Sequence, residues 1–315
     1  MNYKKASLTA IFSLAILLAG RSTSAEAPEW SKATAAAEAA NQRGEYQLAE
    51  TSYKQAIELQ QNTLGADNPA VAITLNNLAV FYQDQSMYPQ AEQTYKQALA
   101  ILEKGPHGNA SFAHTLNNLA ALYHDQGKDD KAEAYYLQSL ILWNEQGSSE
   151  TLVAAEAMFH LAEFYHTRSN NLSAEPMYAH ALAIWNTAGQ LETPEAITVQ
   201  STLGNIYRAE GKYAQAEPLL AQALEGTEMK LGQDQLKVAS SLNSLGLLYY
   251  CESNYDSAEP LYRRALEIRI QALGADDPIV LQTMQIYAAV LRQEGRKAEA
   301  LKMEEQADAM AIAKL

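Results

Sequence analysis

The sequence predicts an all-α protein of about seven helical hairpins that stack into a right-handed α-α superhelix without strands. A small residue recurs along the chain at intervals of 41 or 42 residues, and two apolar stripes with helical spacing accompany each recurrence. No segment shows sustained period-two alternation. Because a single hairpin cannot bury its apolar face, neighbouring hairpins must stack into a solenoid with a concave inner surface.

The second helix of each predicted hairpin carries a buried stripe. Its small residues are Ala49, Ala91, Ala132, Ala174, Ala216, Ala258 and Ala300, and Glu follows directly in the first six. Four residues after the first six stand Tyr53, Tyr95, Tyr136, Tyr178, Leu220 and Tyr262. This spacing places the stripe on one helical face, and we expect its tyrosines to fill the core between hairpins.

The first helix carries a matching stripe, thirteen residues upstream of the small residue of the second helix. Its members are Leu78, Leu119, Leu161, Leu203, Leu245 and Tyr287, each followed by Ala or Gly. Three residues after this Ala or Gly stand Tyr82, Tyr123, Tyr165, Tyr207, Tyr249 and Leu291. Short turns such as Gly127-Lys128 then join the two helices into a hairpin.

The connections between hairpins contain helix-stop and helix-start residues. Two nearly identical segments, 65–69 and 274–278, run from a Gly that ends one helix through Asp or Asn to a Pro that suits the next first turn. Pro176, Pro218 and Pro260 lie inside helical patterns, and we expect them in the opening turn of the second helix. Glu304 replaces the stripe Tyr in the last repeat, as suits a terminal helix that faces water.

These patterns predict the organisation of the chain. A signal peptide covers residues 1–25, a short segment follows at 26–29, and the solenoid covers 30–315. Its repeats are expected at about 30–69, 70–110, 111–149, 150–194, 195–236, 237–278 and 279–315.

The N-terminus is typical of an export signal. Lys4 and Lys5 precede an apolar run from Ala10 to Ala19 that is too short to span a bilayer, and small residues lead to an expected cleavage after Ala25. Leu18-Ala19-Gly20 has the first three residues of a lipobox, but Arg21 replaces the Cys that would carry the lipid. The protein is therefore expected in the periplasm or the extracellular medium, with no integral membrane span.

Composition and motifs argue against several functional classes. The formal net charge of −14 disfavours nucleic acid and anionic membranes as partners. The six His include His114, His124, His160 and His166, but they show no zinc-ligand spacing, so no metal site is predicted. The only cysteine, Cys251, lacks a disulfide partner and a recognisable base. No catalytic constellation and no cofactor site are predicted.

The repeats resemble tetratricopeptide repeats (TPR), and specifically the 42-residue kind of kinesin light chains and many bacterial proteins. The resemblance rests on the Ala-Glu-x-x-Tyr pattern and on Leu75-Asn76-Asn77-Leu78-Ala79, Leu116-Asn117-Asn118-Leu119-Ala120 and Leu242-Asn243-Ser244-Leu245-Gly246. It covers about residues 30–312 and implies a scaffold that binds a protein or a peptide rather than an enzyme.

In related arrays the first helices line the inner groove. Carried over by register, the resemblance implies these groove residues: Asn76, Asn77, Asn117, Asn118, Phe159, His160, Asn205, Arg208, Asn243 and Tyr250. An Asn amide both donates and accepts, so it can pair with the backbone of any partner, although it can equally be solvated or bond a neighbouring helix. Some repeats of this family grip a terminal carboxylate with Lys and Arg beside Asn, whereas the groove of repeats two and three here carries Asp84 and Asp125 and no basic residue. This favours a neutral or basic partner segment, and Arg208 and Arg292 make the far end less acidic.

Three hypotheses follow for the function. The first is an exported scaffold that holds an extended or helical segment of a partner protein in its concave groove. The second is a structural component of an envelope assembly that self-associates through its convex face, which a concentration-dependent mass in light scattering would reveal. The third and most remote is an enzyme with a cryptic site in the His-rich region.

Overall fold

A computed structural model describes residues 27–105, 110–145, 151–230 and 235–312. These residues form fourteen α-helices and no strand, as the sequence predicts. The chain divides into two compact units, Met1–Phe164 and Tyr165–Leu315, and the boundary falls within one helix. The predicted signal peptide lies outside the described residues. None of the described helices is long and apolar enough to cross a membrane.

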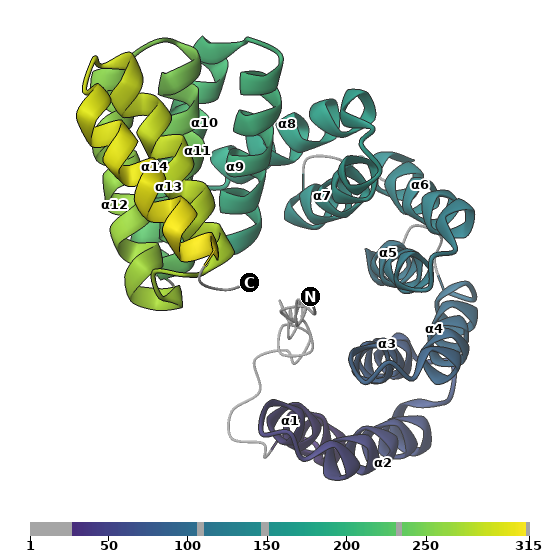
Figure 1. Ribbon diagram of the computed structural model, residues 1–315. Helices are drawn as coiled ribbons and strands as arrows, with labels where there is room; N and C mark the ends of the chain where they lie inside the picture. Colours follow the sequence, from purple (N-terminus) through teal and green to yellow (C-terminus); the bar gives the residue numbers. More distant parts are fainter. Residues whose placement is uncertain (1–26, 106–109, 146–150, 231–234, 313–315) are drawn as a thin grey trace. The chain divides into compact units, whose positions relative to one another are not determined.

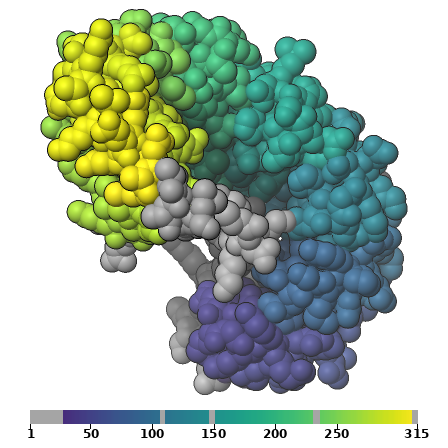
Figure 2. Space-filling view, in the orientation of Figure 1, coloured from purple at the N-terminus to yellow at the C-terminus, as the bar shows by residue number. Residues whose placement is uncertain are grey.

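The helices of the first unit follow one another as successive hairpins (Figure 1). They are α1 (Glu29–Gln42), α2 (Tyr46–Leu64), α3 (Pro69–Asp84), α4 (Tyr88–Leu102), α5 (Ala110–Asp125), α6 (Asp129–Glu145) and α7 (Leu152–Thr167), which crosses the unit boundary. α1 pairs with α2, α3 with α4 and α5 with α6, and each hairpin also contacts the next. The space-filling view shows these hairpins in continuous contact from purple to blue (Figure 2).

The second unit repeats the same plan. Its helices are α8 (Asn171–Thr187), α9 (Pro194–Ala209), α10 (Tyr213–Lys230), α11 (Gln235–Cys251), α12 (Tyr255–Leu273), α13 (Pro278–Gln293) and α14 (Lys297–Ile312). α9 pairs with α10, α11 with α12 and α13 with α14. At the end of the stack, Glu304 of α14 forms an ion pair with Arg292 of α13, so the polar residue predicted for a terminal helix has a partner.

Both predicted stripes form the core. The second-helix stripe is buried throughout the described residues: Tyr53, Tyr95, Tyr136, Tyr178, Leu220 and Tyr262 are each at most 4% exposed. The first-helix stripe is equally covered, because Leu78, Leu119, Leu161, Leu203, Leu245 and Tyr287 are at most 6% exposed. The large side chains of one helix therefore fill the space beside the small residues of the other, as stacked hairpins require.

The helix ends agree with the predicted caps at the two long connections. The Asn68 side chain accepts a hydrogen bond from Ala70 N at 2.9 Å, and the Asp277 side chain accepts one from Ile279 N at 2.8 Å. The preceding helices end at Gly65 and Gly274, both with positive φ. These connections satisfy backbone groups that a helix end leaves without an intrahelical partner.

The prediction for the three prolines is wrong. Pro176, Pro218 and Pro260 are each the sixth residue of their helix, one turn further in than expected. Two of these helices begin earlier because Asn170 and Asn254 cap them, accepting from Ser173 N and Ser257 N at 3.3 Å. Each proline consequently removes one backbone hydrogen bond from its helix, a cost that the packing of the adjacent stripe must offset.

The short turns inside the hairpins share a left-handed residue that the sequence reveals only in part. φ lies between 59° and 83° at Gly44, Ser86, Gly127, Ser169, Gly211, Ser253 and Gly295, which recur at the repeat interval. Glycine adopts this conformation without steric cost, whereas serine does so with strain. Ser86, Ser169 and Ser253 hold it because the following residue bonds back to the first helix, as Met87 N does to Tyr82 O at 2.8 Å.

Candidate functional site

The first helices of the first unit lie side by side on one face, which we call the first-helix face (Figure 1). It is formed by α3, α5 and residues 152–164 of α7, and α3 contacts α5 directly. Because the repeat is 41 or 42 residues long, side chains at equal positions of successive helices become neighbours across the stack. This face carries six of the groove residues expected from the sequence.

Two of the asparagines connect successive hairpins. Asn118 Nδ2 donates to Asn76 Oδ1 at 3.1 Å and lies 3.4 Å from His114 Nε2. Asn76 and Asn117 are buried, at 6% and 5% exposure, whereas Asn77 and Asn118 are partly exposed. In both Asn pairs, therefore, the first Asn faces the interior and the second Asn reaches the surface.

The buried amide of the third repeat lacks the hydrogen bond that the second repeat makes. Asn117 Oδ1 is buried and has no hydrogen-bond partner among the described residues. Forty-two residues after Asn118 stands His160, so the residue that would donate to Asn117 by register is a histidine. An unpaired buried carbonyl oxygen costs about 1–3 kcal/mol, which marks this as a strained point of the face.

The two histidines of the face are neutral at pH 7. Burial lowers the pKa of His160 to about 4, and the neighbouring His114 lowers it further. Burial also lowers the pKa of His114. Phe159 is buried beside them, with its ring centroid 5.2 Å from that of His160. The floor of the first-helix face is therefore neutral in this region.

Acidic groups lie at the ends of α3 and α5. Gln83 Nε2 donates to Asp125 Oδ2 at 2.8 Å, and the hydroxyl of buried Tyr95 donates to Gln83 Oε1 at 3.0 Å. Asp84 is exposed. Burial and, secondarily, the charges of Asp84 and Asp125 raise the pKa of Tyr95. This end of the face presents negative charge to a ligand.

In the second unit a different polar cluster occupies the first helices. Asn205 Nδ2 donates to Ser201 O at 2.9 Å and to Ser244 Oγ at 3.3 Å, and Arg208 Nε donates to Asn205 Oδ1 at 3.5 Å. Asn243 is partly exposed, but its buried Oδ1 has no hydrogen-bond partner among the described residues. Tyr250 is also partly exposed. The structure thus brings four of the expected groove residues to α9 and α11.

A link between hairpins that was not predicted from the sequence recurs along the first helices, at the position of Tyr82 in three repeats and at the position of Leu78 in the last. The tyrosine hydroxyl of a first helix donates to the Glu of the preceding second helix: Tyr82 to Glu50 at 2.8 Å, Tyr123 to Glu92 at 3.0 Å, Tyr249 to Glu217 at 2.9 Å, and Tyr287 to Glu259. The signal was present in the Glu that follows the first six small residues. These bonds explain why that Glu recurs in the repeat.

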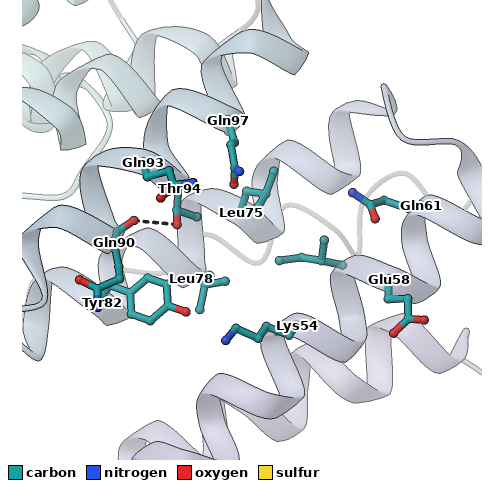
Figure 3. Close-up of a pocket in the computed structure, with 11 residues that line it drawn as sticks. Lys54, Glu58, Gln61, Leu75, Leu78, Tyr82, Gln90, Gln93, Thr94 and Gln97 are labelled. Atoms are coloured by element: carbon teal, nitrogen blue, oxygen red, sulfur yellow. Dashed lines mark hydrogen bonds between the residues drawn. The ribbon is translucent and has the colours of Figure 1, made fainter.

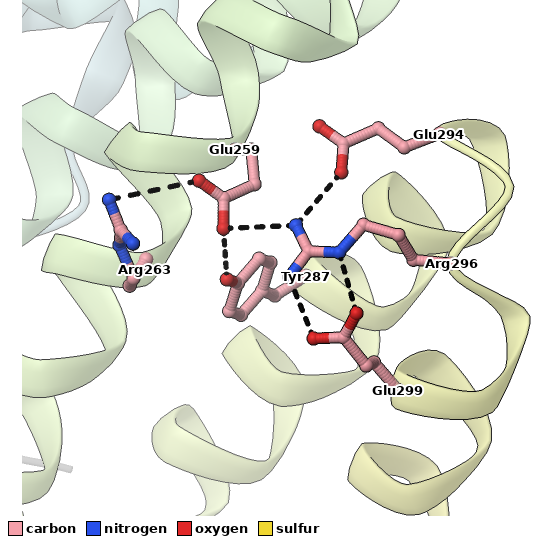
Figure 4. A network of polar contacts seen from close by, with 6 residues as sticks. All are labelled: Glu259, Arg263, Tyr287, Glu294, Arg296 and Glu299. Atoms are coloured by element: carbon pink, nitrogen blue, oxygen red, sulfur yellow. Dashed lines mark hydrogen bonds and ion pairs between the residues drawn. The ribbon is translucent and has the colours of Figure 1, made fainter.

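The same carboxylates also carry ion pairs. Lys54 and Lys96 pair with Glu50 and Glu92 at 2.7 and 2.6 Å, and the hydrogen bonds from these lysines lower the pKa of each Glu. At the end of the second unit, Figure 4 shows Glu259 between Tyr287 and Arg296, which also contacts Glu294 and Glu299. These groups have structural partners and contribute to cohesion between repeats.

His124, His166 and Cys251 have ordinary surroundings. His124 Nδ1 lies 3.2 Å from Asp129 Oδ1, and His166 Nδ1 lies 2.8 Å from Asn171 Oδ1. Each histidine therefore contacts the first residue of the next helix along the chain. Within the described ranges no three His, Cys, Asp or Glu side chains converge as a metal site would require. Cys251 is exposed as a free thiol.

A cavity of about 330 Å³ opens on the opposite side of the first unit, between α2 and α4 (Figure 3). Ile57, Leu75 and Leu78 give it an apolar floor, and Tyr82 closes one end. Its rim is polar: Lys54, Glu58, Gln61, Gln90, Gln93, Thr94 and Gln97. Sequence reasoning did not find it, because the rim residues are unremarkable for an exposed helical face.

Comparisons with known proteins agree on the repeat type. The family model described as tetratricopeptide repeat matches residues 31–104, 111–187, 195–271 and 237–313. No curated protein sequence gives a significant match.

Solved structures resemble the chain at low sequence identity. A signal transduction ATPase with numerous domains from Pyrococcus horikoshii, which has a tetratricopeptide repeat sensor, is 16% identical with a TM-score of 0.69, over 90% of this chain and 41% of that one. The apo form of RapI is 15% identical with a TM-score of 0.64, over 90% and 77%. TPR-like repeats of a kinesin light chain from Podosopora anserina are 21% identical with a TM-score of 0.55, over 65% and 98%. At these identities the likeness shows the fold alone.

Proposed function

Because the chain belongs to the tetratricopeptide repeat family, we propose that it is an exported, non-catalytic scaffold that holds an extended or helical segment of a partner protein on its first helices. TPR proteins bind proteins and peptides, and the family supports that class of function here. Export rests on the N-terminal sequence: two lysines, a short apolar run and small residues before the expected cleavage point.

The observation that carries the groove assignment is the amide row of the first-helix face. Asn76 and Asn118 are bonded to each other across two hairpins, so their positions are fixed before any ligand arrives. Asn77 lies beside them on α3 and is partly exposed. A preorganised amide next to an accessible one can pair with the backbone of an extended segment at a low entropic cost.

The charge on this face supports a neutral or basic partner segment. Asp84 is exposed, Asp125 is held by Gln83, and His114 and His160 are neutral at pH 7. A peptide carboxylate would meet repulsion at the Asp84 end, whereas a Lys or Arg side chain would be attracted there. In the second unit, Arg208 and Tyr250 would contact the partner through a cation and an aromatic ring, two groups that are enriched at binding hot spots.

Capture of the partner tests the assignment. The full chain without its signal peptide is used as bait for the native envelope fraction, and bound proteins are quantified by mass spectrometry. Asn77→Ala with Asp84→Ala in the first unit, and Arg208→Ala with Tyr250→Ala in the second, are expected to reduce the captured partner at least fivefold. These side chains are partly or fully exposed, so helicity by circular dichroism should not change.

The matched control is Ile141→Ala, on the second helix α6, where the side chain is 55% exposed. Its capture should equal that of the wild type. Unchanged capture in both groove variants would rule out the first-helix assignment. Loss of capture in the Ile141 variant alone would instead favour the rival hypothesis, in which the protein associates through its second helices. That face is partly apolar, because Leu137 lies one turn from Ile141 and is 40% exposed.

A further inference from the structure

The cavity between α2 and α4 is lined by a side chain that is smaller than its counterparts in later repeats. The position in question directly precedes the buried second-helix stripe residue. It is small in the first two repeats, Ser52 in α2 and Thr94 in α4, and large in the later ones: Tyr135 in α6, Met177 in α8, Leu219 in α10, Leu261 in α12 and Met303 in α14. Thr94 is turned toward its own helix, where its hydroxyl donates to Gln90 O at 2.8 Å. Its short side chain lines the cavity together with Leu78 and Tyr82 (Figure 3).

The next hairpin shows what fills the equivalent space. Tyr82 corresponds to Tyr123 of α5, and the ring of Tyr135 stacks on Tyr123 with centroids 5.5 Å apart and an interplanar angle of 17°. In the second unit the same position is filled by aliphatic side chains: Leu261 packs against the cluster of Leu245 and Leu248, and Met303 packs against the cluster that contains Tyr287. At this position a large side chain therefore packs against the first helix of its own hairpin in α6, α12 and α14.

The walls of the cavity fit an inserted tyrosine. Ile57, Leu75 and Leu78 supply an apolar floor for a ring, and Gln61, Gln90 and Gln93 supply amides at the rim. Amides can bond a phenol hydroxyl or the backbone that flanks the ring. A volume of about 330 Å³ is at the lower limit of ligand pockets, which span about 300–1,000 Å³, and is suited to one side chain with its neighbouring backbone rather than to a helix.

We propose that this cavity is a docking site for a single tyrosine side chain of a partner protein, which takes the place that Tyr135 occupies in the next hairpin. The site lies on the second-helix side of the first unit, so it goes beyond the proposed function and does not depend on the first-helix face. One aromatic side chain can bury about 150–250 Å², enough to anchor a partner at a point that the first helices do not reach.

Reciprocal substitutions test the proposal with a defined probe. The probe is the peptide acetyl-Gly-Tyr-Gly-amide, titrated into the full mature chain while the methyl signals of Ile57, Leu75 and Leu78 are followed by NMR. We expect these signals to shift with the Tyr peptide and not with acetyl-Gly-Ala-Gly-amide. In Thr94→Tyr the chain's own ring fills the space, and binding should weaken at least tenfold. In Tyr135→Thr a second site should open, seen as new shifts at Leu116 and Leu119, the counterparts of Leu75 and Leu78.

Several outcomes would overturn the proposal. They are no shift at the three methyl groups, equal binding by wild type and Thr94→Tyr, or binding of p-cresol without binding of the Tyr peptide, which would identify a small-molecule site instead. Methyl shifts that depend on protein concentration without any probe would show that a second copy of the chain fills the cavity, which also contradicts it. If Thr94→Tyr fails to fold, Tyr135→Thr still decides, because the absence of a new site there would refute the size argument.

Discussion

Tyr95→Ala is expected to lower the free energy of unfolding by about 4 kcal/mol. Tyr95 is fully buried in α4, and its removal leaves a cavity in the core between hairpins. The change also removes the donor to Gln83 Oε1, which holds Gln83 against Asp125 across two repeats. Urea unfolding followed by circular dichroism at 222 nm measures the loss. Because the stability of repeat arrays is a sum of local terms, the transition of the first unit should move most.

Tyr95→Phe is the matched control for this prediction. It keeps the ring and removes only the hydroxyl, so the expected loss is about 1 kcal/mol. A loss below 1 kcal/mol for Tyr95→Ala would contradict the packing described here, because it would mean that the ring does not fill the space between α3, α4 and the next hairpin. Similar losses in both variants would assign the effect to the hydrogen-bond chain rather than to the core.

Acidification from pH 6.5 to pH 4 is expected to destabilise the first unit by about 3 kcal/mol through His160. The folded protein holds the pKa of His160 at about 4, below the ordinary value of 6.5, because burial disfavours the charged ring. The unfolded chain therefore takes up a proton before the folded chain does. The stability contributed by neutral His160 is present above pH 6.5 and is lost as the pH falls through about 4. His114 acts in the same direction, since burial lowers its pKa too.

His160→Asn isolates this effect. Asn stands at the equivalent position of the preceding repeat, where Asn118 donates to Asn76, so the substituted amide should reach the unpaired Asn117 Oδ1. The difference in unfolding free energy between wild type and variant, measured from pH 7.5 to pH 4, should grow as the pH falls. A difference that does not change with pH would show that His160 is not kept neutral by the fold. Glu50 and Glu92, whose pKa values are lowered by their lysine partners, are present in both proteins, so their titration cancels in the difference.

The sequence was sufficient to predict the fold because each repeat specifies the same two helices. The two stripes predict which positions are buried, and the structure buries Tyr178 of the second-helix stripe and Leu119 of the first-helix stripe completely. The helix starts at Asn68 and Asp277 were also visible, because a cap followed by Pro is a local signal. Pro176 was misplaced because the earlier cap, Asn170, begins the helix one turn before the position that the proline suggests.

The candidate site was less predictable than the fold. Neighbouring residues of a helix point about 100° apart, and the repeat register alone does not show which of two neighbours is buried. Asn76 and Asn77 both belong to the expected groove, yet Asn76 is buried beneath Asn118 and Asn77 is partly exposed. The tyrosine–glutamate links needed the stacking of two hairpins, because Tyr82 and Glu50 lie 32 positions apart. The cavity at Thr94 depends on a comparison of side-chain sizes across repeats after their positions are known.

Site-directed photo-crosslinking tests most directly whether a partner binds the first-helix face. A photoreactive benzoylphenylalanine replaces Asn77 on α3 or, as the control, Ile141 on α6, and the chain is irradiated in its native envelope fraction. We predict a discrete adduct with a partner protein from position 77 and none from position 141. Adducts from position 141 alone, or adducts only with a second copy of this chain, would contradict the proposed function.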